Sequence, residues 1–310
     1  MSVVPWTEKY RPQIIDDVIG QKNSIFKKFI EKKFLPNMIF HGESGIGKTS
    51  LIYVIINEIY DDSMMFLIIN ASEERGIDVI RDKVYQFSMN GNIMNSNIPK
   101  LIVLDEVDAL TIEAQNMLGK IINMSTKFIR FCLICNQLKN IDLSLQSKCI
   151  KFHLNVPSLE EIKNKINKII ELEKITITEN GINCLLDKTK DMRKILNILQ
   201  TMHCSKEYID ESTINKYLSY PTKKEIDDLY DKLLNESFNN IFIYFDNLIQ
   251  NGNSVFDILG RLIDKMMYDN KLNLKIIKEL GKMEAETNLC PQNMICSYII
   301  SIFIKYRKII

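Results

Sequence analysis

The stretch HGESGIGKTS, residues 41–50, decides the fold because it contains the pattern G-x-x-x-x-G-K-T. Gly42 and Gly47 allow a tight backbone turn, so successive N–H groups can point inward at phosphate oxygens. In this pattern Lys48 reaches the β and γ phosphates of a nucleotide, and the Thr49 hydroxyl holds Mg²⁺. The predicted phosphate-binding loop consists of Gly42, Glu43, Ser44, Gly45, Ile46, Gly47, Lys48, Thr49 and Ser50.

The flanks of the loop have the order that phosphate binding needs. An apolar run, Met38–Phe40, precedes the loop and predicts a buried strand. After the loop, apolar residues recur at helical spacing: Leu51, Ile52, Ile55, Ile56 and Ile59. An ordinary strand-to-helix turn can match the bare pattern, but strand, glycine loop and helix in this order favour nucleotide binding.

Short apolar runs alternate with helical patterns over the first half of the chain. They occupy residues 38–40, 66–69, 101–104, 131–134 and 150–154. Runs that are continuously apolar are typical of strands buried on both faces, so we expect an α/β fold with a parallel sheet covered by helices.

The second half of the chain is predicted to be helical. Ser158 and Glu161 form a capping box that opens a helix, and amphipathic segments continue to about Tyr217. A break at residues 220–222 precedes a further helical region without a chemical motif. We therefore expect three domains: an α/β nucleotide-binding domain over residues 1–156, a helical lid over 157–220 and an all-α collar over 221–310.

Composition excludes some classes of protein. The net charge of +1 argues against a surface that is basic throughout. Seven scattered cysteines do not suggest a disulfide framework, which favours a reducing, intracellular compartment. The N-terminus has no apolar signal core, and the apolar segment Met294–Ile304 is too short to span a bilayer of about 30 Å. We expect a soluble protein.

Acidic residues follow a second predicted strand in LIVLDEVDAL, residues 101–110. Open α/β sheets place their ligands at the carboxyl ends of strands. Asp105 is suited to bind Mg²⁺, and Glu106 is suited to polarise an attacking water. Asn136 ends another strand, where its amide can bond the water or the γ-phosphate. Each feature alone fits an ordinary turn, whereas their combination favours a catalytic site.

Cys132 and Cys135 form a C-x-x-C pair within the strand predicted at 131–134. Residues three apart on a strand point to opposite faces, and no second pair lies nearby. We interpret both as small buried apolar residues rather than as redox or zinc ligands.

Further motifs resemble the small subunits of replication factor C, the AAA+ clamp loader of eukaryotes, archaea and some large DNA viruses. PWTEKYRP (residues 5–12) with DVIGQ (17–21) is similar to the family's N-terminal signature. NASEERGIDVIR (70–81) is close to the family's NASDERGIDVVR, and LTIEAQNML (110–118) resembles the helix after the acidic strand. DMRKILNILQ (191–200) matches the sensor 2 helix.

The resemblance assigns further site residues. It implies that the N-terminal signature packs on adenine, with Arg11, Val18 and Ile19 in the nucleotide site, and that Arg193 senses the γ-phosphate. It also implies ATP and Mg²⁺ as ligands and a five-membered ring, of identical or different chains, that opens a sliding clamp of the proliferating-cell-nuclear-antigen type. The clamp is loaded onto primer-template DNA, in the nucleus or a viral replication compartment.

Three positions depart from the family pattern. The glycine before the sensor 2 aspartate is Lys190, and the double arginine after the acidic strand is Gly119-Lys120. The family's Ser-Arg-Cys, whose arginine reaches the ATP of the neighbouring subunit, is Ser147-Lys148-Cys149. Lysine lacks the planar fork of arginine, so Lys148 is expected to be a weakened trans finger.

Partner contacts are predicted in the segment that opens at Gly76-Ile77. Ile77 and Arg81 are candidates for DNA-backbone contact, because helix N-termini and basic side chains suit phosphate. A solvated helix charge is the equal alternative for Arg81. Val84 and Phe87 are candidates for clamp contact, although an apolar pair at this spacing is more often core.

Two alternative functions remain open from the sequence. Another AAA+ DNA motor, such as a branch-migration helicase, shares the loop and the acidic strand end, but NASEERGIDVIR argues against it. A scaffold subunit that binds ATP with little turnover is favoured by Lys148 and Gly119 and opposed by Lys48, Asp105 and Glu106.

Overall fold

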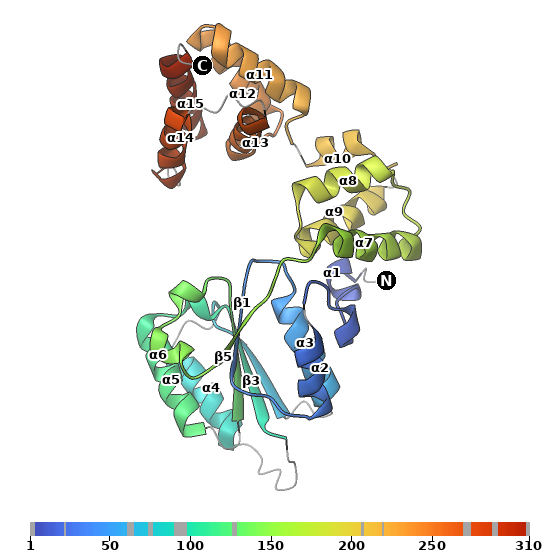
Figure 1. Ribbon diagram of the computed structural model, residues 1–310, viewed down its shortest axis with the longest axis vertical. Helices are drawn as coiled ribbons and strands as arrows, with labels where there is room; N and C mark the ends of the chain where they lie inside the picture. Colours follow the sequence, from blue (N-terminus) through green and yellow to red (C-terminus); the bar gives the residue numbers. More distant parts are fainter. Residues whose placement is uncertain are drawn as a thin grey trace. The chain divides into compact units, whose positions relative to one another are not determined.

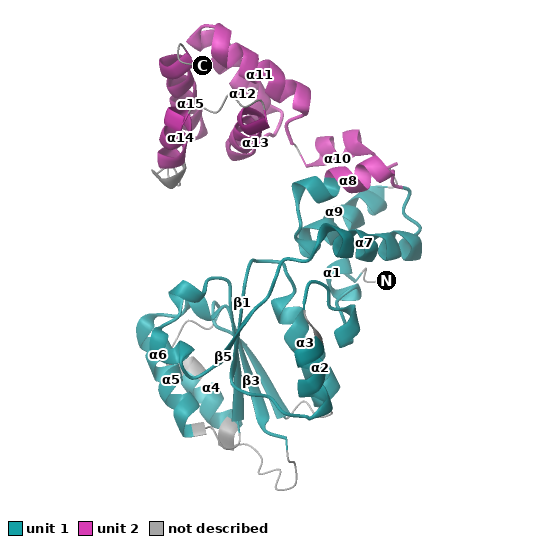
Figure 2. Ribbon diagram, in the orientation of Figure 1, with its two compact units in different colours: residues 1–176, 185–207 teal, residues 177–184, 208–310 magenta. Residues whose placement is uncertain are grey.

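The computed structural model describes most of the chain. The described residues are 4–21, 23–60, 65–73, 77–89, 98–125, 129–205, 208–218, 220–268, 274–286 and 291–307. The chain divides into two compact units, residues 1–176 with 185–207 and residues 177–184 with 208–310 (Figure 2). The division runs through helix α8 (Glu179–Lys188). The three domains expected from the sequence therefore stay a prediction.

A five-stranded parallel sheet forms the centre of the first unit, as predicted. The strand order is β2-β3-β4-β1-β5, and all the pairings are parallel. The strands are β1 (Met38–His41), β2 (Phe66–Asn70), β3 (Lys100–Asp105), β4 (Ile129–Cys135) and β5 (Ile150–His153). The three central strands are almost fully buried, but Ile150 on β5 is 52% exposed. A strand at the edge has a neighbour on one side only, so β5 and β2 are less buried than a continuous apolar run predicts.

Helices cover both faces of the sheet, which gives three layers (Figure 1). Helices α2 (Asn23–Glu31) and α3 (Lys48–Ile59) pack on one face through a core that includes Phe26 and Ile52. Helices α4 (Ile77–Met89), α5 (Ile112–Ser125) and α6 (Leu143–Gln146) cover the other face. Their core includes Val84, Leu118 and Leu145. The apolar positions of α3 that were predicted from spacing are all buried.

The remaining helices of the first unit follow the sheet or precede it. Helix α7 (Leu159–Glu173) begins with the predicted capping box, in which Ser158 and Glu161 bond each other's backbone N–H. Helix α9 (Met192–Ser205) carries the predicted sensor 2 motif. The N-terminal helix α1 (Trp6–Lys9) is short, and the 3-10 helix η1 (Ile15–Asp17) follows it.

The second unit is a helical bundle. It contains α10 (Glu211–Tyr217), α11 (Lys223–Asn235), α12 (Phe238–Gln250), α13 (Val255–Tyr268), α14 (Leu274–Glu286) and α15 (Gln292–Tyr306). One apolar core joins α11 to α15, and it includes Tyr230, Phe245 and Phe303. Helix α15 contains the long apolar segment, and its residues Ile295, Ile299 and Phe303 are buried in that core, as predicted. Among the described residues, no helix has the length and hydropathy to cross a membrane.

Candidate nucleotide-binding site

The predicted site residues of the sheet meet at the carboxyl ends of three adjacent strands. Strand β1 leads into the phosphate-binding loop, β3 ends at Asp105, and β4 ends one residue before Asn136. These strands are neighbours in the order β3-β4-β1, and His41 at the end of β1 pairs with Cys135 at the end of β4. Strands β1 and β4 are neighbours in the sheet but are not consecutive in the chain. The connections that leave them, to β2 and to β5, run to opposite sides of the sheet, and parallel sheets bind ligands at such a switch point.

The loop has the backbone geometry of a phosphate cradle. Gly47 caps α3 in the left-handed region, with φ 92°, and Gly45 also has a positive φ of 77°. A Cβ at Gly45 would lie 2.2 Å from the carboxyl carbon of Asp191, so only glycine fits there. The loop thereby presents the N-terminus of a twelve-residue helix to the site, and such ends favour anions.

Lys48 is the buried cation of the loop, with 7% of its surface exposed. Its Nζ donates to the carbonyl oxygens of Gly42 at 2.9 Å and Glu43 at 2.6 Å, and to Oδ1 of Asn136 at 2.7 Å. Burial lowers the pKa of Lys48, while the nearby Asp105 carboxylate opposes that shift. The amine therefore lies within reach of both the loop and Asn136, where it can bond phosphate oxygens.

Thr49 and Asp105 form the oxygen-rich part of the site. The Thr49 hydroxyl donates to Asp105 Oδ2 at 2.8 Å, and Asp105 Oδ1 accepts from the backbone N–H of Glu106 at 2.9 Å. A hydroxyl beside a carboxylate is a donor set that suits Mg²⁺. Glu106 adopts a left-handed conformation with φ 56°, which is uncommon outside glycine, and its side chain is exposed.

Asp108 was not predicted from the sequence, although it stands within the same acidic stretch. Its Oδ2 accepts from the backbone N–H groups of Asn136 at 3.1 Å and Gln137 at 3.2 Å. This carboxylate therefore bonds the backbone of the turn that carries Asn136. The acidic run DEVD (residues 105–108) was the only sequence signal that pointed to Asp108. Its contact with the turn after β4 is known only from the fold.

Two adjoining cavities contain most of the predicted residues. A polar cavity is lined by Ser44, Gly45, Gly47, Lys48, Thr49, Asp105, Glu106, Asn136 and Arg193, among others. A second cavity is lined by Arg11, Val18, Ile19, Gly45, Ile46, Gly47, Ser50, Arg193 and Leu196, among others. Gly45, Gly47 and Arg193 line both cavities, so the loop and the start of α9 connect them. We call the first cavity the phosphate end and the second the base end.

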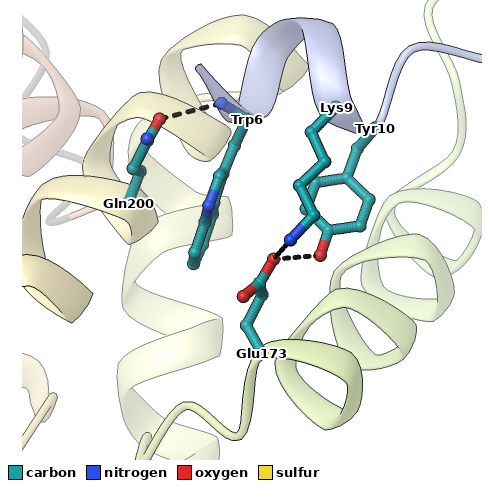
Figure 3. A network of polar contacts seen from close by, with 5 residues as sticks. All are labelled: Trp6, Lys9, Tyr10, Glu173 and Gln200. Atoms are coloured by element: carbon teal, nitrogen blue, oxygen red, sulfur yellow. Dashed lines mark hydrogen bonds and ion pairs between the residues drawn. The ribbon is translucent and has the colours of Figure 1, made fainter. Parts of the chain in front are cut away.

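Helix α1 lines the base end and is attached to α7 and α9 (Figure 3). The backbone N–H of Trp6 donates to Oε1 of Gln200 at 2.8 Å. Lys9 Nζ and the Tyr10 hydroxyl both donate to Oε1 of Glu173. The bond from Lys9, and after it the bond from Tyr10, holds the pKa of Glu173 below its ordinary value. The same carboxylate raises the pKa of Lys9.

Trp6 supplies the apolar part of this attachment. Its side chain is 4% exposed, and its ring lies 5.5 Å from the His203 ring and 6.0 Å from the Tyr10 ring, centroid to centroid. The partners Glu173, Gln200 and His203 are all more than 160 residues away in sequence. The sequence motifs gave no signal for this contact.

Lys148 contacts its own chain. Its Nζ donates to the carbonyl oxygen of Gly119 on α5 at 2.8 Å. A Cβ at Gly119 would approach that Nζ to 3.0 Å. The lack of a side chain at Gly119 therefore leaves space for the lysine amine. The two departures from the family pattern, at 119 and 148, are therefore in contact.

The candidate partner contacts on α4 differ in exposure. Val84 is 1% exposed and Phe87 packs partly buried against the same core, which agrees with the core alternative given for this apolar pair. Tyr85, which is 60% exposed, is the aromatic side chain that this part of α4 presents. Arg81 is exposed and its Nε bonds Asp82 at 3.1 Å. Helix α4 begins at Ile77, whose side chain lies outside the described residues, as does Gly76.

The cysteine pair is structural, as interpreted from the sequence. Cys132 and Cys135 are buried, and burial raises the pKa of Cys132 well above its ordinary value and that of Cys135 to about 12. Within the described part of the chain, no three histidine, cysteine or acidic side chains gather as metal ligands.

Comparison with known proteins identifies the family. The profile of the ATPase family associated with various cellular activities (AAA) matches residues 38–158, and that of the replication factor C C-terminal domain matches residues 221–288. Replication factor C subunit 3 of Schizosaccharomyces pombe is 34% identical, over 91% of this chain and 85% of the relative. Replication factor C subunit 5 of Homo sapiens is 33% identical over the same shares. The chain belongs to the replication factor C small-subunit family.

Solved structures support the fold. The Thermotoga maritima RuvB Holliday junction branch migration motor matches with a TM-score of 0.54 over 76% of this chain and 85% of that chain. At 14% identity this likeness shows a common fold alone. The family membership shows that the first unit carries an AAA ATPase domain.

Proposed function

We propose that this chain is an ATP-hydrolysing subunit of a clamp loader, which helps to open a sliding clamp and load it onto primer-template DNA. The observation that carries the proposal is the meeting of Lys48, Thr49, Asp105 and Asn136 in one polar cavity of a replication factor C family member. The relatives favour this function over that of a branch-migration motor, because the chain resembles such a motor in fold alone.

The residues present fit ATP with Mg²⁺. The glycine loop would hold the phosphates, Lys48 would bond their outer oxygens, and Thr49 with Asp105 would hold the metal. The bound Mg²⁺ would neutralise charge on the phosphates. Glu106 would orient and polarise water, Asn136 would bond the water or the γ-phosphate, and Arg193 would supply positive charge from α9. Arg11, Val18 and Ile19 would enclose the base.

The partners follow from family membership and from exposed residues. A multisubunit complex is implied by the relatives, which are named as numbered subunits. DNA would be bound through phosphates at the start of α4, near Arg81, without sequence preference. On α4 the exposed Tyr85 replaces Val84 as our candidate for clamp contact. The protein would work where the DNA is replicated, in a nucleus or a viral replication compartment.

DNA-stimulated ATP turnover by the assembled complex tests this proposal. The proposal predicts stimulation by primer-template DNA that falls steeply with salt and is nearly the same for different sequences, because the contacts are to phosphates. Release of a loaded clamp should require hydrolysis. Stimulation that depended strongly on sequence at fixed salt would indicate another kind of DNA protein.

Lys148 is proposed as a weakened trans finger. Its bond to Gly119 keeps the amine on its own chain, and arginine fingers are typically worth about 10³ to 10⁵ in rate. In the assembled complex, Lys148→Arg should raise turnover and Lys148→Ala should lower it. Gly119→Ala, which crowds the amine, should change turnover only while Lys148 is present. Equal rates for all these variants would favour the alternative that Lys148 is a tolerated change at an interface where the partner binds no ATP.

A further inference from the structure

We propose that Asp108 is a positioning residue for ATP hydrolysis, which holds Asn136 in place by bonding the backbone that carries it. The proposal rests on the proposed ATPase function and adds a residue to it. Asp108 would touch neither phosphate nor water. It would act by fixing the Asn136 backbone just beyond the end of β4, and this backbone sets the direction of the Asn136 side chain.

The position of Asp108 is itself well fixed. It lies in the 3-10 helix η3 (Val107–Ala109), directly after the strand that ends at Asp105. Its neighbour Val107 is fully buried, and Leu110 is 7% exposed, so both sides of this short helix are anchored in the core. The half-buried Asp108 is therefore held between two residues that are packed in the core.

Asp108 accepts hydrogen bonds from backbone N–H groups that lie just beyond the end of the sheet. The pairing of β1 with β4 ends at His41 and Cys135, and the N–H groups of Asn136 and Gln137 lie beyond that pair. Both N–H groups donate to the same oxygen, Oδ2 of Asp108, at 3.1 and 3.2 Å. Two bonds from successive amides to one oxygen fix the orientation of that peptide unit.

The fixed peptide unit determines where the asparagine amide lies. Asn136 Oδ1 accepts from Lys48 Nζ at 2.7 Å, so the chain of bonds runs from Asp108 through the Asn136 backbone to the lysine of the phosphate loop. Asn136 is exposed, so we expect its position to depend mainly on these hydrogen bonds. A shift of about 1 Å in a group that positions reactants can cost about 100-fold in rate.

The alternative is that Asp108 only stabilises the structure, and an experiment must distinguish that role from positioning Asn136. A carboxylate that bonds backbone N–H groups also stabilises a turn, so its removal should lower the melting temperature. Asp210 offers a matched control, because it caps α10 in the second unit by accepting from the Thr213 N–H at 2.8 Å. Asp210→Ala should lower the melting temperature without changing turnover.

The experiment measures ATP affinity and steady-state turnover of the full chain assembled with its partner subunits. Asp108→Ala should lower kcat about 10-fold or more and change ATP affinity less than about 3-fold, because positioning affects the reaction rather than binding. Asp108→Asn, which keeps an acceptor oxygen but loses the charge, should recover part of the rate. This second variant also serves if the alanine variant does not fold.

A double-mutant cycle decides whether the effect passes through Asn136. Asn136→Ala alone should lower kcat, and adding Asp108→Ala to it should cause no further loss. Wild-type turnover in Asp108→Ala, wild-type turnover in Asn136→Ala, or losses that multiply in the double variant would each overturn the inference. If the wild-type complex itself hydrolysed no ATP, the proposed function would fail instead, which is a different result.

Discussion

The two ends of the nucleotide site are built in different ways. At the phosphate end, Lys48 and Thr49 bond Asn136 and Asp105, and all four residues stand at the ends of hydrogen-bonded strands or at the start of α3. At the base end, helix α1 is held to α7 and α9 by contacts that each involve a side chain, such as those of Trp6 (Figure 3). We therefore expect that the base end can loosen without displacing the groups that stand at the ends of the strands.

The attachment of α1 depends more on Trp6 than on the ion pair beside it. Burying a tryptophan is typically worth about 3 to 5 kcal/mol when compared with alanine. The Lys9–Glu173 pair has a half-exposed lysine, and surface ion pairs contribute about 0 to 1 kcal/mol. We therefore expect α1 to stay attached when the ion pair is lost and to detach when Trp6 is truncated.

The largest expected effect is at the phosphate end. Glu106→Gln should lower kcat by about 10² to 10⁴, because an amide can occupy the same place but cannot polarise water as a carboxylate does. ATP affinity should stay close to wild type. Rapid-quench turnover and calorimetry on the same preparation measure the two quantities, with the exposed Glu160→Gln on α7 as the control. Equal loss of binding and turnover would contradict the role given to Glu106.

A smaller effect is expected at the base end. Trp6→Ala should weaken ATP binding by about 10-fold through the detached α1, and Glu173→Gln by less than about 3-fold. Both variants should keep kcat near wild type at saturating ATP, because the phosphate end is held by the sheet. A fall in kcat as large as that of Glu106→Gln would show that the two ends are not separable.

The smallest effect is a pH dependence of α1 attachment. Glu173 has a pKa below its ordinary value of 4.5, so its contacts contribute fully above that value and are lost as the pH falls through the lowered pKa. Lys9 has a pKa above 10.5, so its contribution is complete below that value and is lost at higher pH. Attachment should therefore be constant around neutral pH.

Trp6 reports this dependence directly because it is the only tryptophan of the chain. Its emission should shift as the pH falls below the ordinary glutamate pKa of 4.5, before the far-ultraviolet circular dichroism changes. In Glu173→Gln the early shift should be absent. An emission change that always coincides with global unfolding would show that the carboxylate has no separate role.

The sequence predicted the phosphate end better than the base end, for a physical reason. Lys48, Thr49, Asp105 and Asn136 all follow strands of one parallel sheet, and parallel strands bring their carboxyl ends to one edge. The attachment of Trp6 depends on contacts with residues near position 200, which no local pattern reveals.

Asp108 and Tyr85 were not singled out from the sequence, for the same physical reason. Asp108 lies in a quoted motif, but its partners are backbone groups 28 and 29 residues away, which spacing does not identify. Val84 and Tyr85 are neighbours in sequence, and only the packing of α4 on the sheet decides that the first is buried and the second exposed.

ATP affinity of Lys48→Ala, measured by calorimetry in the presence of Mg²⁺, tests the central claim most directly. The account predicts a loss of about 100-fold, since the variant removes the buried cation whose charged hydrogen bonds are each worth about 1.5 to 3 kcal/mol. The exposed Lys32→Ala should bind as the wild type does. Unchanged affinity in Lys48→Ala would contradict the assignment of the loop and, with it, the nucleotide site.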